Sequence, residues 1–272
     1  MQTENSRCVL VQNHIISSLH LNREVLIDFY IPSNIQYNHV SLLLINDGQD
    51  LVRMGFENIL EDLYGAQKLK PLLCAGIHCG PDRRNEYGTA AHLDFKGRGS
   101  KAIAYNRFIF EELLPFTRKL FAISSFIEKS FCGFSLGGLS ALDIVWNHPV
   151  EFSRVGVFSG SLWWRSVGQD DILFDENKHR IMHMQIRNGG YYPWLKFFFE
   201  TGSKDETADR NNNGIIDAID DTLSCIEELV LKGYSLDSDI IYLEMKDGKH
   251  DVPTWAEAFP AFLQWGWDPE ER

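Results

Sequence analysis

The sequence lacks the features that would indicate a membrane-spanning or nucleic-acid-binding protein. Its longest apolar runs, such as residues 40–45, are far too short to cross a bilayer. Acidic residues outnumber lysine and arginine, and the formal net charge is −12. Because nucleic acids and anionic membrane surfaces are bound by clustered basic side chains, we expect neither as a partner. Residues 1–6 show no basic segment followed by an apolar run, so no signal peptide is expected.

Cysteine is present but shows no ligand pattern. The five cysteines are odd in number and lack the paired spacing of a zinc site. Cys8, Cys74 and Cys132 stand in apolar stretches, where a thiol behaves as a small buried hydrophobe. We therefore expect reduced thiols and a cytoplasmic location, and the sequence leaves the oligomeric state open.

No internal repeat, low-complexity tract or linker divides the 272 residues, which are 44% hydrophobic. A chain of this kind suits one α/β domain, residues 1–272, with a substantial core. Strands are expected at residues 9–16, 24–31, 40–45, 72–77, 126–132, 154–158, 194–199 and 240–243, and helices at 56–67, 102–121, 138–146, 222–232 and 255–265. This alternation predicts a mostly parallel central sheet with helices on both faces.

Residues 133–137 read Gly-Phe-Ser-Leu-Gly, with Ser135 at the centre. Glycines two residues before and after a serine allow a sharp turn from strand to helix, which exposes the hydroxyl as a nucleophile. The strand predicted before this segment and the helix predicted after it supply the context that such a turn needs. The pattern therefore makes Ser135 a candidate nucleophile.

A serine hydroxyl needs a base that removes its proton, and in α/β-hydrolases that base is a histidine late in the chain. His250 follows the strand predicted at 240–243 and precedes a helix that begins near Pro253, so it is the expected base. His179 and His183 lie in a polar segment and are expected at the surface.

The base needs an acid that orients it, and this acid should follow the preceding strand. Asp205, which comes after the strand predicted at 194–199, is the preferred acid, and Glu206 is the alternative. An acyl-transfer site also needs backbone N–H donors for the oxyanion. We expect them at Leu136, directly after the nucleophile, and at Gln49, in the turn that follows the strand predicted at 40–45.

These motifs together resemble the esterase D-like family of α/β-hydrolases, which includes enterochelin esterases, feruloyl and acetyl xylan esterases, and mycolyltransferases. The matching segments are residues 43–49, 83–87, 111–115, 133–138, 158–161 and 248–250. The resemblance implies an α/β-hydrolase fold and a serine carboxylic-ester hydrolase that acts on a small-molecule ester. It also implies a Ser135–Asp205–His250 triad that needs no cofactor for its chemistry. An acyltransferase or thioesterase, or a non-catalytic binding module, is the alternative.

Four residues are candidates for a substrate pocket. Arg83, Glu86 and Tyr87 lie in the loop where members of the resembled family shape the substrate cleft, and Trp163 supplies an aromatic surface near the carboxyl edge of the sheet. A network of ion pairs is the alternative for the loop residues, and core packing is the alternative for Trp163.

Residues 209–220 have the spacing of a calcium-binding loop. Oxygen-bearing side chains stand at loop positions 1, 3 and 5, glycine at position 6, and acids at positions 9 and 12. The segment resembles EF-hand and dockerin loops, which implies side-chain ligands from Asp209, Asn211, Asn213, Asp217 and Asp220 and the carbonyl of Ile215. A structural Ca²⁺ would then hold the loop that carries Asp205. A turn that caps the following helix is the alternative.

Overall fold

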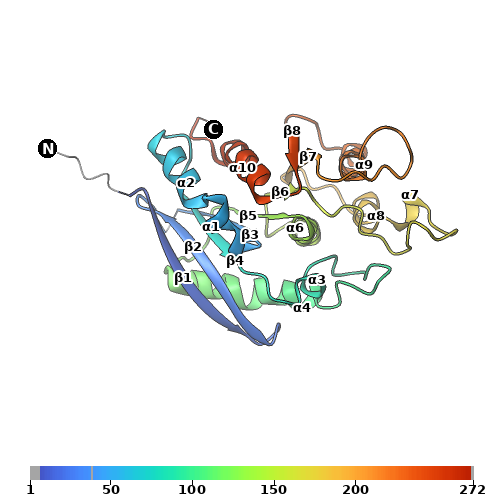
Figure 1. Ribbon diagram of the computed structural model, residues 1–272. Helices are drawn as coiled ribbons and strands as arrows, with labels where there is room; N and C mark the ends of the chain where they lie inside the picture. The colour runs from blue at the N-terminus through green and yellow to red at the C-terminus, as the bar shows by residue number, and fades with distance from the viewer. Residues whose placement is uncertain (1–6, 38, 271–272) are drawn as a thin grey trace.

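The computed structural model describes residues 7–37 and 39–270, in which eight strands form one sheet (Figure 1). The strands are β1 (Val9–Ser18), β2 (Arg23–Pro32), β3 (Ser41–Asn46), β4 (Leu72–Ile77), β5 (Lys129–Phe134), β6 (Arg154–Phe158), β7 (Lys196–Lys204) and β8 (Ile240–Lys249). Their order across the sheet is β1-β2-β4-β3-β5-β6-β7-β8. Strand β2 runs antiparallel to both of its neighbours, and the pairs from β4 to β8 are parallel. The prediction of a mostly parallel sheet is confirmed.

Helices cover both faces of this sheet. They are α1 (Leu51–Met54), α2 (Phe56–Gly65), α3 (Arg83–Glu86), α4 (Ala102–Arg107), α5 (Leu114–Leu120), α6 (Leu136–Asn147), α7 (Glu176–His179), α8 (Ile181–Asn188), α9 (Asp217–Lys232) and α10 (Val252–Trp267), with the 3-10 helix η1 (Gly48–Asp50) and the π-helical segment η2 (Phe108–Leu113). Apolar side chains of α1, α2 and α10 pack on one face. Those of α4, η2, α5, α6, α8 and α9 pack on the other.

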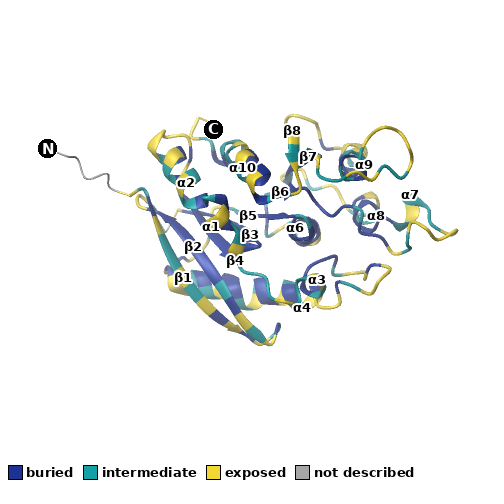
Figure 2. Cartoon of the chain, in the orientation of Figure 1, coloured by how far each residue is buried: buried dark blue, intermediate teal, exposed yellow. Residues whose placement is uncertain are grey.

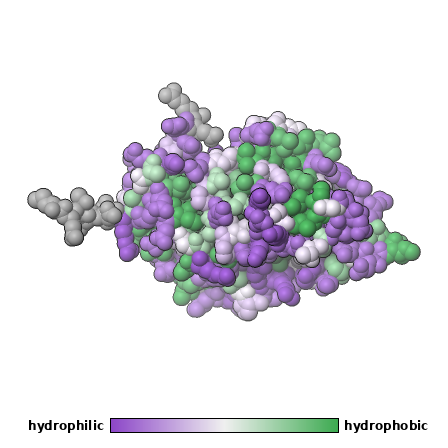
Figure 3. Space-filling view, turned by 45° about the horizontal axis from the view of Figure 1, so that its top comes forward, coloured by the Kyte–Doolittle hydropathy of each residue, from purple (hydrophilic) through white to green (hydrophobic). Residues whose placement is uncertain are grey.

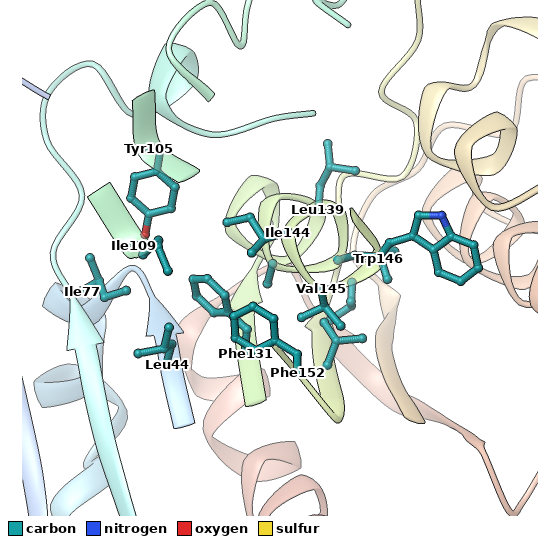
Figure 4. Packing of buried hydrophobic residues seen from close by; sticks show 14 of the residues in the cluster. Leu44, Ile77, Tyr105, Ile109, Phe131, Leu139, Ile144, Val145, Trp146 and Phe152 are labelled. Atoms are coloured by element: carbon teal, nitrogen blue, oxygen red, sulfur yellow. The ribbon is translucent and has the colours of Figure 1, made fainter. Parts of the chain in front are cut away.

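The core follows from this layering. Every residue of β3 and β4 is buried, as expected for parallel strands covered on both sides. Figure 2 shows the central strands as buried, whereas the edge strand β1 alternates between buried and exposed residues. Figure 4 shows the larger core cluster, where Phe131 of β5 lies close to Leu44 of β3 and Ile144 of α6. The central strands are therefore packed on both faces, and their carboxyl ends are well placed to carry a site.

Two features of the fold differ from expectation. The helix predicted at 102–121 is divided into α4, η2 and α5, and Pro115 lies in the first turn of α5, where its missing N–H costs little. His183 was expected at the surface, and that prediction is wrong. The residue is 2% exposed, because it lies on the side of α8 that packs against α9, where its Nε2 is 2.9 Å from the carbonyl oxygen of Asp221.

The surface and the thiols are as the composition suggests. Figure 3 shows one face on which hydrophobic side chains gather between hydrophilic ones. In the part of the chain that the structure describes, no helix has the length and apolar character needed to cross a membrane. All five cysteines carry free thiols, and Cys74 and Cys132 are buried as expected, while Cys8 is half-buried.

Strand β5 and the first turn of α6 approach so closely that Gly133 cannot carry a side chain. A Cβ atom at this position would lie 2.5 Å from the carbonyl group of Gly137. We expect Gly133→Ala to lower the free energy of unfolding in urea by about 1–3 kcal/mol, because backbone atoms must shift to make room. Gly65→Ala is the matched control, since a Cβ at that residue meets no atom within 4 Å. Equal stability of the two variants would contradict the packing argument.

Candidate active site

Ser135 stands at the turn between β5 and α6. Its φ of 54° and ψ of −122° lie in a region that residues other than glycine rarely adopt. Its N–H donates to the carbonyl of Phe158 at 2.8 Å, and its own carbonyl accepts from the N–H of Ser161 at 3.1 Å. These bonds to the end of β6 hold the strained turn in place. The sharp turn from strand to helix that the sequence predicts is present.

The hydroxyl of Ser135 lies beside a second hydroxyl. Its Oγ is 3.4 Å from the Oγ of Ser161, a long contact in which either group can donate. Among the described residues, this Oγ makes its hydrogen-bonding contact with Ser161 and none with His250. The nucleophile and the base predicted from the sequence are thus at the same edge of the sheet without a hydrogen bond between them.

Neighbouring parallel strands bring His250 and Asp205 together. His250 directly follows β8, and Asp205 directly follows β7. The Nδ1 atom of His250 lies 4.0 Å from Oδ2 of Asp205, which is longer than a hydrogen bond. The Asp205 side chain is 1% exposed and that of His250 is 41% exposed. The imidazole also packs edge-on against the indole of Trp255, with ring centroids 5.4 Å apart.

The surroundings shift the pKa of both groups. Burial raises the pKa of Asp205, and the neighbouring Ser159 and His250 counteract this rise. Burial lowers the pKa of His250 below its ordinary 6.5; the charge of Asp205 opposes this fall and that of Arg83 adds to it. His250 is therefore mainly neutral at pH 7, which is the form that can accept a proton from a serine.

The predicted oxyanion loop follows β3 as a tight turn. Asp47 has a left-handed backbone, with φ of 60° and ψ of 44°. A Cβ atom on Gly48 would lie 2.4 Å from the carbonyl carbon of Gly76, so only glycine fits where the loop crosses β4. Leu136 is the first residue of α6, where N–H groups have no partner within the helix. The amides of Gln49 and Leu136 remain the predicted oxyanion donors.

Arg83, predicted in the substrate pocket, binds the protein itself. Its Nε and Nη2 donate to the two carboxylate oxygens of Asp47 at 2.7 and 2.6 Å. Nη2 also donates to the carbonyl of Phe134, directly before Ser135, at 3.2 Å. The N–H of Asp47 donates to the Tyr87 hydroxyl at 3.2 Å. The segment around α3 thus ties the predicted oxyanion loop to the turn that carries Ser135.

The other predicted pocket residues differ in how much surface they offer. Glu86 is 1% exposed and accepts two hydrogen bonds from Arg23, at 2.8 and 2.7 Å. Tyr87 is fully buried, so these two side chains present little surface to a ligand. Trp163 is half-buried and lines a cavity of about 480 Å³, next to the guanidinium of Arg98 at 5.0 Å from its ring. Trp163 therefore lines a cavity, and its contact with a substrate stays a prediction.

The segment predicted to bind calcium lies between β7 and α9. The Asp209 carboxylate accepts from the N–H groups of Asn213 and Gly214 at 3.1 and 2.9 Å. The side chain of Asn213 accepts a hydrogen bond from the N–H of Ile215 at 2.8 Å. Asp217 forms an ion pair with Arg210 at 3.2 Å, and the amide of Asn211 donates to Asp220 at 2.7 Å. Within residues 7–37 and 39–270, no group of three or more His, Cys, Asp or Glu side chains is placed to hold a metal ion. This arrangement does not support the calcium site, because the acids are satisfied by the loop itself and by Arg210.

Sequence reasoning missed two residues behind the predicted acid. Ser159, directly after β6, has a positive φ of 45° and accepts a hydrogen bond from Nε1 of Trp255 at 2.9 Å. Glu200 is a fully buried acid within β7. The signal that could have revealed it is a lone carboxylate directly after three phenylalanines, at 197–199.

Comparison with known proteins identifies the family of this chain. A family model described as "Putative esterase" matches residues 18–265. Over 151 residues, which make up 53% of this chain and 59% of the relative, the chain is 28% identical to the uncharacterized protein YjcH of Bacillus subtilis (strain 168).

Solved structures with the same fold include three that are named for ester or serine hydrolysis. Enterochelin esterase from Shigella flexneri has a TM-score of 0.73 at 19% identity, over 98% of this chain and 60% of that one. A ferulic acid esterase has a TM-score of 0.66 at 15% identity, over 96% and 98%. An IroE-like serine hydrolase from Shewanella oneidensis has a TM-score of 0.69 at 16% identity, over 94% and 79%.

These comparisons settle the fold and the family. The chain spans about three fifths of the curated relative and of the enterochelin esterase. The structural likeness, together with the mostly parallel sheet and its strand order, shows the α/β-hydrolase fold. Since the family model covers most of its length, the chain belongs to this esterase family of α/β-hydrolases.

Proposed function

We propose that the protein is a serine carboxylic-ester hydrolase in which Ser135 attacks the carbonyl carbon of a small-molecule ester. The observation that carries the proposal is the strained turn at Ser135, at the same sheet edge as the adjacent side chains of Asp205 and His250. Membership of the esterase family supports it. A serine, a histidine and an acid can perform this reaction without a cofactor.

The reaction follows from the roles of these groups. As Ser135 Oγ bonds to the carbonyl carbon, neutral His250 takes its proton, and the N–H groups of Gln49 and Leu136 stabilise the oxyanion. His250 then returns the proton to the departing alcohol. In the second half of the reaction, water attacks the acyl group with His250 again as the base, and Ser135 leaves with the returned proton. Asp205 orients the imidazole and stabilises its charged form. The 4.0 Å separation of His250 and Asp205 fits a free enzyme, because such contacts often shorten when substrate binds.

The names of related structures suggest which esters to test first. They include an enterochelin esterase, a ferulic acid esterase and a siderophore hydrolase from Aspergillus nidulans. We propose a screen of siderophore, feruloyl and acetyl-sugar esters, with other alcohols and thiols as competing acyl acceptors. The single-domain organisation and the cytoplasmic location stay predictions.

Replacement of the nucleophile tests the proposed activity. We expect Ser135→Ala to lower kcat for nitrophenyl acetate by at least about a thousandfold, because the variant lacks the hydroxyl that forms the acyl-enzyme. A fluorophosphonate probe should label the parent at Ser135 and leave this variant unlabelled. Ser161→Ala is the matched control, since it removes the neighbouring hydroxyl and should still be labelled. Turnover that persists in Ser135→Ala would sink the proposal.

Isosteric amides distinguish the two candidate acids. Asp205→Asn should lower kcat by about 10³–10⁴, because an amide cannot stabilise the imidazolium and favours the wrong tautomer of His250. Glu206→Gln should have a much smaller effect, and both variants should unfold in urea near the parent's midpoint. A larger loss of kcat in Glu206→Gln would assign the acid to Glu206 instead.

The calcium loop stays a prediction with a direct test. If residues 209–220 bind Ca²⁺, calorimetric titration detects the binding and a chelator lowers the Tm of the calcium-loaded protein, because an ion that binds the folded state stabilises it. Asp209→Ala should weaken binding, whereas Asp62→Ala, which removes an exposed acid of α2, should not. No heat of binding and an unchanged Tm would contradict the prediction.

A further inference from the structure

Glu200 is a buried acid for which the proposed mechanism has no role. It lies in β7, paired across the sheet with Phe158 of β6 and Leu243 of β8. The residue is 0% exposed, and neither Oε1 nor Oε2 has a hydrogen-bond partner in the described residues. An ionised carboxylate buried without a partner is so costly that the group takes up a proton instead. Burial, followed by the charge of Asp205, raises the pKa of Glu200 to about 8.

Among the described residues, Asp205 lacks a hydrogen-bond donor. Its side chain is buried, and both carboxylate oxygens lack a hydrogen-bond donor in the described residues. Ser159 lies beside both acids. It lowers the pKa of each, which opposes the rise caused by burial. The N–H of Ser159 donates to the backbone carbonyl of Glu200 at 2.8 Å, which fixes the two residues side by side. A hydroxyl thus stands next to one acid that can donate and one that can accept.

The other groups around these acids are already engaged. The charge of Glu200 acts on Tyr242 of β8, but that side chain packs on the opposite face of the sheet with Phe199, and its hydroxyl lies 2.7 Å from Oγ1 of Thr201. From α10 comes the uncharged Trp255, whose Nε1 donates to Ser159 Oγ at 2.9 Å. Besides Ser159, the charges of His250 and Asp251 act on Asp205. None of these groups satisfies the orphaned oxygens of Glu200.

We propose that Glu200 is a positioning residue that holds the Asp205 carboxylate through Ser159, an inference that rests on the proposed role of Asp205. Protonated Glu200 donates its O–H to Ser159 Oγ, and Ser159 donates its own O–H to Asp205. The indole N–H of Trp255 occupies the second acceptor site of the same oxygen. The chain of hydrogen bonds fixes the acid that orients His250, and it moves no net proton.

This arrangement depends on the proton of Glu200. When Glu200 ionises, two buried carboxylates face a hydroxyl that has one proton, and their repulsion displaces Asp205 from His250. The kcat of the parent should therefore fall as the pH rises through about 8. Folding stability should respond as well. The pKa in the folded protein lies above the ordinary 4.5, so the unfolded chain releases this proton first, and the free energy of unfolding should fall between pH 4.5 and about 8.

Two substitutions separate positioning from filling of space. In Glu200→Gln an amide N–H replaces the acid O–H and cannot titrate. We expect kcat for nitrophenyl acetate at pH 7 to be about fivefold lower, KM to be unchanged, and the decline above pH 8 to be absent. Glu200→Leu keeps the volume but has no donor, so kcat should fall by about a hundredfold. An alkaline decline that persists in Glu200→Gln, or equal kcat in the two variants, would overturn the inference.

Urea unfolding at pH 5, 6.5 and 8 gives a readout that needs no turnover. The free energy of unfolding of the parent should fall more steeply with pH than that of Glu200→Gln. Glu228→Gln, which changes a buried glutamate paired with Arg187, should keep the parent's pH profile of kcat. Equal slopes in parent and Glu200→Gln overturn the inference whether or not the protein hydrolyses esters, whereas a parent without Ser135-dependent turnover counts against the proposed esterase activity.

Discussion

The ion pair between Asp47 and Arg83 is the contact on which the rest of the site depends. It joins two backbone turns that both have positive φ at a residue other than glycine, at Asp47 and at Ser135. Such turns cost free energy and persist only where surrounding contacts determine them. Arg83 supplies these contacts, since one guanidinium binds the Asp47 carboxylate and the carbonyl of Phe134. The loop predicted to stabilise the oxyanion and the turn that carries the predicted nucleophile are therefore fixed relative to each other.

Close backbone packing makes this ion pair possible. A Cβ atom on Gly137 would lie 2.5 Å from Oδ2 of Asp47, so the carboxylate passes directly over the first turn of α6. The side-chain amide of Asn46 donates to the carbonyl of Gly137 at 2.8 Å. The glycines around Ser135 thus serve two purposes, because they permit the sharp turn and leave room for the groups that hold it.

The two acids near His250 differ from Asp47, which is held by an ion pair. Within the part of the chain that the structure describes, Asp205 and Glu200 have no ion pair of hydrogen-bonding length, and burial raises the pKa of both. A protonated Glu200 can donate a hydrogen bond, whereas an ionised Asp205 can only accept one. The site therefore combines a firmly paired carboxylate at Asp47 with a pair of acids whose charge depends on pH.

The sequence by itself determined the strands, the turn at Ser135 and the order of the candidate triad. Continuous apolar runs identify strands covered on both faces, and the glycines around Ser135 permit the sharp turn that bulkier residues would block. The sequence could not show that Arg83 binds Asp47, that His183 is buried or that Glu200 lies behind Asp205. These facts depend on contacts between segments far apart in the chain, whereas periodicity reports only which face of an element is apolar. The tertiary structure alone decided which charges are paired and which acid stands without a partner.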